Sequence, residues 1–373
     1  MPPTSLTRMS ALDRVRSLLA QRRWRVALGA AAVLVVAPVV VLAANRGGDA
    51  PEPPTTTRPP TTTTTRPPTT TTTAPPPPVA PLTGVEGAFE GRIKRPALFV
   101  KVDNHPRARP QAGLNQADIV IEEPVEGNLT RLAAVFHSTD SAGVGPVRSM
   151  RTSDLELVPL FGRPLFATSG GNAGVVPQIH NANVVDIGNN VSGGQGFHRA
   201  GGRPAPHNLM TATLDLYAKA PESPPPPRPL FSYLRKGERL PAGSIAVGGM
   251  ALRFGGGEVS RFNWDAASRT WLRSQGGTPH VDAAGVRVAP ENVVVVEIDY
   301  DRSGQLGRSV PHAVVTGSGP VTVLTNGQAV RGTWSRPTLA DPLSLKTAKG
   351  EPIKLMPGQT FIELPVRGGA SFV

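Results

Sequence analysis

An uncharged, apolar run of nineteen residues, 26–44, constrains the architecture of this chain most strongly. A helix needs about 20 such residues to cross a bilayer, and a proline such as Pro38 is tolerated in membrane helices. Six arginines lie within residues 1–25, whereas only Arg46 follows the run closely. The positive-inside rule therefore predicts a basic cytoplasmic tail over 1–25, a single-pass signal-anchor helix over 26–44, and an extracytoplasmic remainder.

A cleaved signal peptide is the alternative, because Ala43 and Ala44 are small enough for a cleavage site. The apolar run is longer than the usual core of a signal peptide, and the tail before it is also long. We therefore expect the anchor to remain, so that the cytoplasmic membrane is the first partner of this chain.

The segment 45–91 follows as a threonine- and proline-rich stretch, in which threonine tracts alternate with Arg-Pro-Pro. Such a segment cannot bury a core, and proline-rich chains favour the extended polyproline II conformation. We predict a disordered stalk, whose residues 47–86 would reach about 120 Å at ~3.1 Å each. Sugars on the threonines fit an exported stalk, and a bare spacer is the equal alternative.

The composition excludes several chemistries. The chain has no cysteine, which rules out an acylated cysteine, disulfides, thiolate metal sites and a cysteine nucleophile. Of the net charge of +12, about +5 lies in the tail and about +7 in the folded part. No basic stripe interleaved with aromatic residues is present, so this bias favours anionic envelope polymers or a phosphorylated ligand over nucleic acid.

The first folded region, 92–220, predicts a mixed α/β domain. Its apolar runs of strand length are 97–102, 117–121, 132–136, 165–168 and 184–187. Ser153 and Glu156 have the spacing of a capping box, which predicts a helix over 154–160.

A proline-rich linker, 221–229, separates this domain from a mainly β domain over 230–373, so the fold class is α+β. Residues 259–264 and 270–273 predict a hairpin, and 293–300 a buried strand. Asn326-Gly327 predicts a second hairpin turn, because both residues accept positive φ. The polar residues of this half alternate as solvent-facing positions do, so we interpret it as a structural or docking domain.

Polar and charged residues follow the predicted strands of the first domain, where ligands gather in α/β sheets. Arginine binds carboxylate or phosphate through two parallel hydrogen bonds, and Asp103 or Glu126 would orient the arginines. The alternative is that these charges pair only with one another and pin the loops. The candidate ligand-binding residues are Asp103, Asn104, His105, Arg109, Glu122, Glu126, Arg131, Arg148, Arg151, His198, Arg199, His207 and Asn208.

Several motifs carry a family resemblance. They are VDNHPRARPQAGLNQADIVIEEPVEGNLTRLAAVF (102–136), VGPVRSMR (144–151), FHRAGGRPAPHNLMT (197–211), FNWDAASRTWLR (262–273), NGQAVRGTW (326–334) and LMPGQTFIEL (355–364). In this order, over about residues 94–365, the chain resembles the YerB-type bacterial lipoprotein family, a family of unknown function with N- and C-terminal domains. The resemblance implies an envelope protein held at the bacterial cell membrane, here with a helix in place of an acylated cysteine. It implies no activity.

Two classes of function follow from these residues. The first is a non-enzymatic module that binds an anionic cell-wall component or an envelope partner protein. The alternative is a hydrolase or transferase acting on cell-wall glycan or a phosphorylated precursor, with Asp103, His105 or Glu122 as acid or base. Under either hypothesis we expect Asp103, His105, Arg148, His198 and His207 to line one cleft.

Known signatures of catalysis and metal binding are missing from the sequence. The chain has no HExxH, no cysteine pair, no GxSxG and no SxxK at its candidate serines. We therefore predict no metal site, no cofactor and no nucleic-acid partner, and assign no catalytic residue.

Overall fold

The computed structural model describes residues 77–302 and 310–373, and Thr73–Val373 form one compact unit. The predicted tail, membrane helix and most of the predicted stalk lie outside the described residues. No helix in the described ranges is both long and apolar enough to span a bilayer. Residues 77–91, which the sequence assigns to the stalk, pack on the fold, where Leu82 is fully buried.

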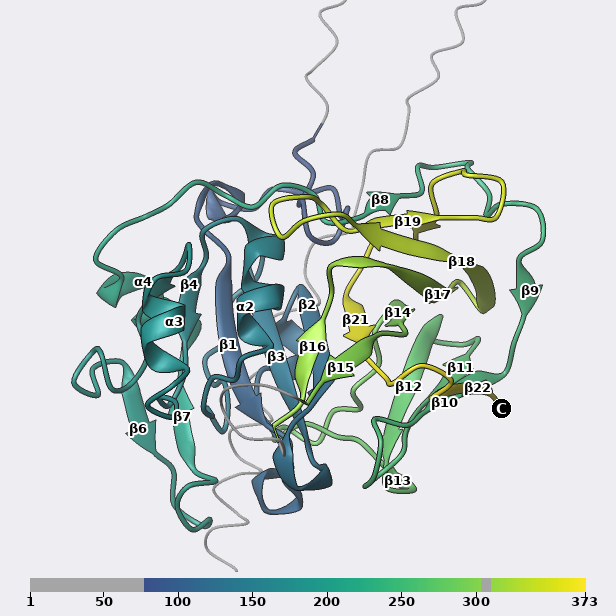
Figure 1. The fold of residues 1–373 in the computed structure, drawn as a ribbon. Coiled ribbons are helices and arrows are strands. Elements are labelled where there is room, and N and C mark those ends of the chain that lie inside the picture. Colours follow the sequence, from purple (N-terminus) through teal and green to yellow (C-terminus); the bar gives the residue numbers. More distant parts are fainter. Residues whose placement is uncertain (1–76, 303–309) are drawn as a thin grey trace, which may run out of the picture. The chain divides into compact units, whose positions relative to one another are not determined.

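The fold is mixed α/β with mainly strands, built around an eleven-stranded sheet (Figure 1). The order is β19-β18-β17-β14-β21-β2-β3-β1-β4-β5, with β9 paired to β18. The strands are β1 (Leu98–Asp103), β2 (Ile119–Pro124), β3 (Thr130–Phe136), β4 (Leu165–Ala167), β5 (Val185–Asp186), β9 (Ile245–Ala246), β14 (Asn292–Val296), β17 (Gly317–Thr325), β18 (Gln328–Arg336), β19 (Ser344–Lys346) and β21 (Thr360–Glu363). Strand β21 lies between β14 and β2 and is parallel to both. Both halves of the sequence therefore contribute to one sheet.

A five-stranded antiparallel sheet of order β13-β12-β11-β10-β22 is the second layer. Its strands are β10 (Gly249–Leu252), β11 (Ser260–Asp265), β12 (Thr270–Gln275), β13 (Thr278–Pro279) and β22 (Ala370–Phe372). Three two-stranded ribbons complete the described strands: β15 (Asp299–Asp301) with β16 (His312–Val314), β8 (Ser232–Tyr233) with β20 (Lys354–Leu355), and β6 (Phe197–Arg199) with β7 (Leu209–Thr211).

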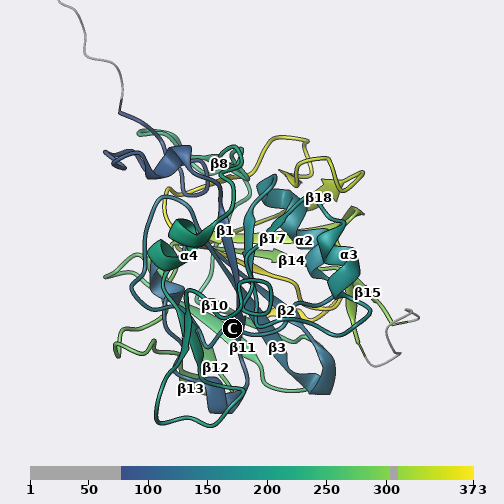
Figure 2. The same ribbon diagram turned by 90° about the vertical axis from the view of Figure 1, so that its left-hand side faces the viewer.

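The helices within residues 77–302 and 310–373 are few and short. The α-helices are α2 (Asp154–Leu157), α3 (Val176–His180) and α4 (Thr213–Lys219), and the 3-10 helices are η1 (Arg92–Lys94), η2 (Pro106–Ala108), η3 (Leu114–Gln116), η4 (Glu126–Asn128) and η5 (Val158–Phe161). In Figure 2, α2 and α3 lie on one side of β1–β3 and the five-stranded sheet on the other.

Two hydrophobic cores occupy the two faces of the large sheet. Successive residues of a strand point to opposite faces, so Phe99 packs in the core with α2 and α3, and Val100 in the core with the five-stranded sheet. The same alternation separates Asp103 from Asn104 at the end of β1. Strands β1, β4 and β5 run parallel, so their carboxyl ends meet at one edge of the fold.

The predicted strands and both predicted hairpins are confirmed, although residues 293–300 divide into β14 and β15. Asn326 and Gly327 have φ of 48° and 73° and join β17 to β18, as their positive-φ preference predicts. The helix after Ser153 is confirmed, but the capping box is wrong. Ser153 has helical φ and ψ, and its hydroxyl bonds Pro311 and Ala313, which are brought close by β16.

Candidate functional site

Asp103 is the centre of a group that we name the Asp103 cluster: Asp103, His105, Arg131, Arg148 and His207. The fully buried carboxylate of Asp103 accepts hydrogen bonds from Nη1 of Arg131 at 2.8 Å and Nδ1 of His207 at 2.7 Å. The backbone N–H of His105 donates a third at 3.1 Å, and Nε of Arg148 lies 3.2 Å from Oδ2. One carboxylate thus faces two guanidinium groups and an imidazole.

The charges around Asp103 determine its protonation. Burial alone would raise the pKa of the Asp103 carboxyl, but the charge of Arg131 and the hydrogen bond from His207 hold it below its ordinary value. Burial lowers the pKa of Arg131 to about 10, so its guanidinium is still protonated at neutral pH. The cluster therefore carries an excess of positive charge.

Backbone pairing with β1 places the two arginines of the cluster, and a loop supplies His207. Arg131 stands opposite Asp103 in the antiparallel register of β1 and β3. Arg148 ends a segment that runs beside β1, where its N–H donates to the Lys101 carbonyl at 2.8 Å. His207 comes from the loop between β6 and β7 and reaches Asp103 across 104 residues of sequence.

Two candidate residues hold the loop that carries His207. Nη1 of Arg199 donates to Oδ1 of Asn208 at 2.8 Å. Nδ2 of Asn208 donates to the Arg203 carbonyl at 3.0 Å, and Arg203 donates to the Ala108 carbonyl at 2.6 Å. Arg199 and Asn208 therefore position the loop, while the side chain of His198 on β6 is exposed and has no hydrogen-bond partner among the described residues.

The rings of His105 and His207 stack, with centroids 4.5 Å apart. Nδ1 of His105 accepts from the N–H of Arg107 at 3.0 Å, so the neutral ring carries its proton on Nε2. Burial, and then the charge of His207, lower the pKa of His105, which favours this neutral form. Nε2 of both rings lacks a hydrogen-bond partner within residues 77–302 and 310–373.

Arg148 is the arginine of the cluster that solvent can reach. Its side chain is 23% exposed, whereas Arg131 is only 4% exposed. Its one ion pair uses Nε, and neither terminal nitrogen bonds any described residue. A guanidinium edge with two free donors matches a carboxylate or phosphate. The Asp103 cluster can therefore bind an anion at Arg148, beside the two histidine rings.

Glu122 is the centre of a second group on the opposite face of the sheet. Its carboxylate accepts from Nη2 of Arg273 at 2.6 Å, Oγ1 of Thr130 at 2.6 Å and Nδ2 of Asn104 at 3.1 Å. Burial alone would raise the pKa of Glu122, but Arg273 and the hydrogen bonds, including one with Glu363, hold it below its ordinary value. Asn104 and Glu122 are thus brought together, but away from the Asp103 cluster.

Glu363 stands beside Glu122 in the parallel register of β21 and β2. Burial, and then the charge of Glu122, raise the pKa of Glu363 well above its ordinary value. No other described donor reaches its carboxyl oxygens. The raised pKa favours the protonated form of Glu363, which can donate to the Glu122 carboxylate.

The interpretation of the polar residues of the second half as solvent-facing is wrong for four of them. Arg273, Gln275, His280 and Glu363 are all buried against residues of the first half. Alternation along β12 places Arg273 and Gln275 on the buried face with Trp271. In the sequence, the spacing of Arg273 two residues after Trp271 indicates that both side chains lie on the same, buried face of the strand.

A third polar group lies beside the Asp103 cluster and was not predicted as a site. Lys101 is fully buried between Glu123 and Asp154, with Nζ 2.8 Å from Oδ1 of Asp154. Burial raises the pKa of Asp154 to about 6. Nearby, Glu126 pairs with Arg151, whose Nε donates to it at 2.8 Å. These residues pair with one another, as the alternative interpretation of the charged loops expects.

In the described part of the chain, no group of three or more His, Cys, Asp or Glu side chains could hold a metal ion. The geometry defines a strand-rich α/β protein with polar groups buried on both faces of one sheet. In its N-terminal part, the partly exposed guanidinium of Arg148 is accessible to an anion.

The chain belongs to the family described as protein of unknown function (DUF3048), whose N-terminal domain matches residues 82–225 and whose C-terminal domain matches 250–362. It is similar to YerB of Bacillus subtilis (strain 168), whose name classes it provisionally as a lipoprotein, with 30% identity over 295 residues, 76% of this chain and 85% of YerB. The crystal structure of YerB protein from Bacillus subtilis superposes with a TM-score of 0.68 and 26% identity, covering 79% of this chain and 99% of that one.

Proposed function

We propose that this protein is an envelope protein, held at the bacterial cytoplasmic membrane by helix 26–44, that binds an anionic group of the cell wall or of an envelope partner at the Asp103 cluster. The provisional naming of YerB as a lipoprotein supports the compartment. This chain has no cysteine to acylate, so the apolar run is the means of attachment that the sequence offers. The stalk 45–91 would set the reach of the binding domain.

The observation that carries this proposal is the pairing of Arg148. The Asp103 carboxylate is shared by Arg131, His207 and Arg148, and leaves the terminal nitrogens of Arg148 unmatched at a partly exposed position. A cation that is only partly neutralised and has free donors is a site for an anion. Phosphate and carboxylate share this chemistry, and both occur as repeating groups in anionic polymers.

Co-sedimentation with isolated cell-wall fractions tests the proposal. The polypeptide from residue 73 on is suitable, because it forms one compact unit with its own core. Loss of charged hydrogen bonds of about 1.5–3 kcal/mol predicts binding that is roughly tenfold to a hundredfold weaker in Arg148→Ala. The control is Arg163→Ala, at an exposed arginine paired with Glu222. Equal binding by both variants contradicts the proposal.

The Asp103–His207 pair favours one second function, hydrolysis of a wall glycan or phosphodiester. With Nδ1 bonded to Asp103, His207 keeps Nε2 available to take a proton from an attacking water, and Arg148 would stabilise the developing negative charge. Release of soluble fragments by the parent, and its loss in His207→Gln with wall binding retained, would support the enzyme. Binding without release in both proteins would support the binding module.

A further inference from the structure

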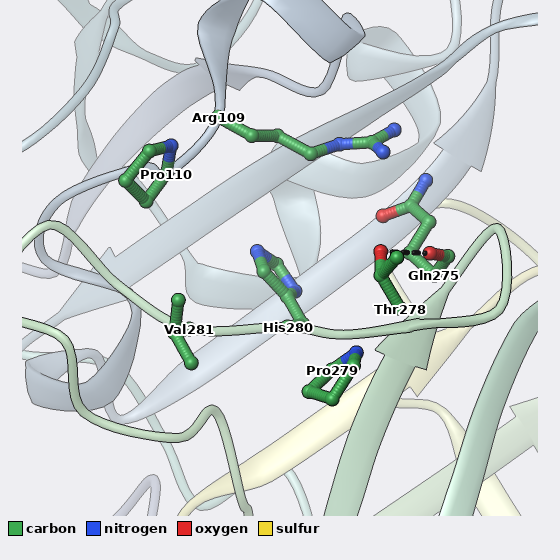
Figure 3. A pocket seen from close by; sticks show the side chains of 7 residues that line it. All are labelled: Arg109, Pro110, Gln275, Thr278, Pro279, His280 and Val281. Atoms are coloured by element: carbon green, nitrogen blue, oxygen red, sulfur yellow. Dashed lines mark hydrogen bonds between the residues drawn. The ribbon is translucent and has the colours of Figure 1, made fainter.

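A cavity of about 190 Å³ lies on the other side of the Asp103–Asn104 segment, at the edge of the five-stranded sheet. It is lined by Arg109, Pro110, Gln275, Thr278, Pro279, His280 and Val281 (Figure 3). The cavity is smaller than the ~300 Å³ of a drug-sized pocket. It therefore suits a small molecule or the end group of a longer one.

Two hydrogen-bond donors at this pocket lack an acceptor. Oε1 of Gln275 accepts from Asn104 at 3.1 Å and from Arg273 at 2.9 Å, which fixes the orientation of the amide. Nε2 of Gln275 then has no partner among the described residues, although the residue is only 4% exposed. Nε2 of Gln275 is not fully enclosed, so it can donate to an acceptor that enters the pocket.

Arg109 provides the second donor. Its Nη2 donates to the Asn104 carbonyl at 2.9 Å and pairs with Glu258, whose side chain is 39% exposed. Its Nε and Nη1 have no hydrogen-bond partner in the described ranges, and Nε is buried. Figure 3 shows the guanidinium of Arg109 and the amide of Gln275 on the same side of the pocket.

The remaining wall is apolar or already satisfied. Nδ1 of His280 accepts from Arg273, and its Nε2 donates to Gln111 at 2.8 Å, so the ring presents carbon atoms to the pocket. Pro110, Pro279 and Val281 add apolar surface. Burial, and then the positive charges of Arg273, Arg109 and Arg287, lower the pKa of His280 to about 2, which reflects a positive potential at this wall.

We propose that this pocket binds the carboxylate of a small aliphatic acid, with Arg109 and Gln275 donating to the carboxylate and with Pro110, Pro279 and Val281 contacting the aliphatic group. The carboxyl terminus of a peptide and a free organic acid share this chemistry. The site is separate from the Asp103 cluster and does not depend on the proposed function.

Calorimetric titration of the polypeptide from residue 73 on with N-acetylalanine tests the proposal, and N-acetylalaninamide is the uncharged counterpart. We expect saturable binding of the acid that is at least tenfold tighter than that of the amide, and at least tenfold weaker in Arg109→Gln. Isobutyrate, which lacks the peptide group, distinguishes the two sources: equal affinity indicates a free acid, and tighter binding of N-acetylalanine indicates a peptide terminus.

Val281→Phe fills the pocket without touching its hydrogen bonds, since Val281 is at the rim and 36% exposed. The matched control is Val286→Phe, at a nearby position that is 55% exposed and outside the lining. We expect only Val281→Phe to lose binding of N-acetylalanine, while both variants keep binding to the wall fraction. Equal affinity for acid and amide, equal behaviour of the two variants, or no saturation at about 10 mM overturns the proposal.

Discussion

Glu122 and Glu363 are neighbouring buried carboxyls for which the same substitution should have opposite effects. We expect Glu363 to hold a proton in the folded protein, because burial and the adjacent Glu122 raise its pKa well above 4.5. In the unfolded chain this carboxyl ionises above about pH 4.5. The folded state therefore binds one more proton than the unfolded state, and the contribution of Glu363 to stability falls as pH rises above 4.5.

The size of this effect follows from the two protonation states. Each pH unit is worth about 1.4 kcal/mol, so the loss at pH 7 is about 3 kcal/mol if Glu363 stays protonated. Glutamine has the shape of the protonated acid and can donate to Glu122, but it binds no proton on folding. We expect Glu363→Gln to match the parent near pH 4.5 and to exceed its free energy of unfolding by about 3 kcal/mol at pH 7.

Glu122→Gln should destabilise the protein at neutral pH. It removes the carboxylate that is paired with the fully buried Arg273, and breaking a buried ion pair from one side costs about 3–5 kcal/mol. Urea unfolding followed by tryptophan fluorescence, from pH 4.5 to pH 8, measures both variants. Glu351→Gln, at an exposed side chain, is the control. Destabilisation at pH 7 by Glu363→Gln would refute a protonated Glu363.

Three further predictions use the same unfolding assay. Lys101→Met removes the cation that is paired with the buried Glu123 and Asp154 and should cost about 3–5 kcal/mol; a cost below about 1 kcal/mol would show that the carboxyls take up protons instead. Leu82→Ala, at a fully buried position, should cost about 2–5 kcal/mol; a surface-like effect would mean that residues 77–91 do not belong to the fold. Gly327→Ala forces alanine to adopt φ near 73° and places its Cβ 2.8 Å from the Trp264 ring, whereas Gly350→Ala at φ 82° meets nothing within 4 Å. Gly327→Ala should therefore lower the free energy of unfolding by at least about 1 kcal/mol more than Gly350→Ala. Equal losses would contradict the contact with Trp264.

Local signals predicted the elements better than they predicted the site. The strand runs and the Asn326-Gly327 turn depend on periodicity and on φ, which neighbouring residues determine. The capping box failed because Ser153 uses its hydroxyl on a segment near residue 312. Tertiary contact can override a local propensity in this way.

The site required information that no local pattern holds. Asp103 meets His207 across 104 residues, and Glu122 meets Arg273 across 151. The sequence could predict that polar residues follow the strands, because that depends on the strand ends alone. Which of them share a face depends on the alternation along β1 and β2 and on the layer packed against each face.

This alternation also explains why the adjacent residues Asp103 and Asn104 lie in two different environments. Asp103 turns to the face covered by α2 and α3 and meets cations that it only partly neutralises. Asn104 turns to the face covered by the five-stranded sheet, where its Nδ2 donates to Glu122 and to Gln275. Gln111 ties the two together, since its Nε2 donates to the Asp103 carbonyl and to Oδ1 of Asn104. The two candidate binding sites therefore depend on adjacent residues at the end of β1 that face opposite sides of the same sheet.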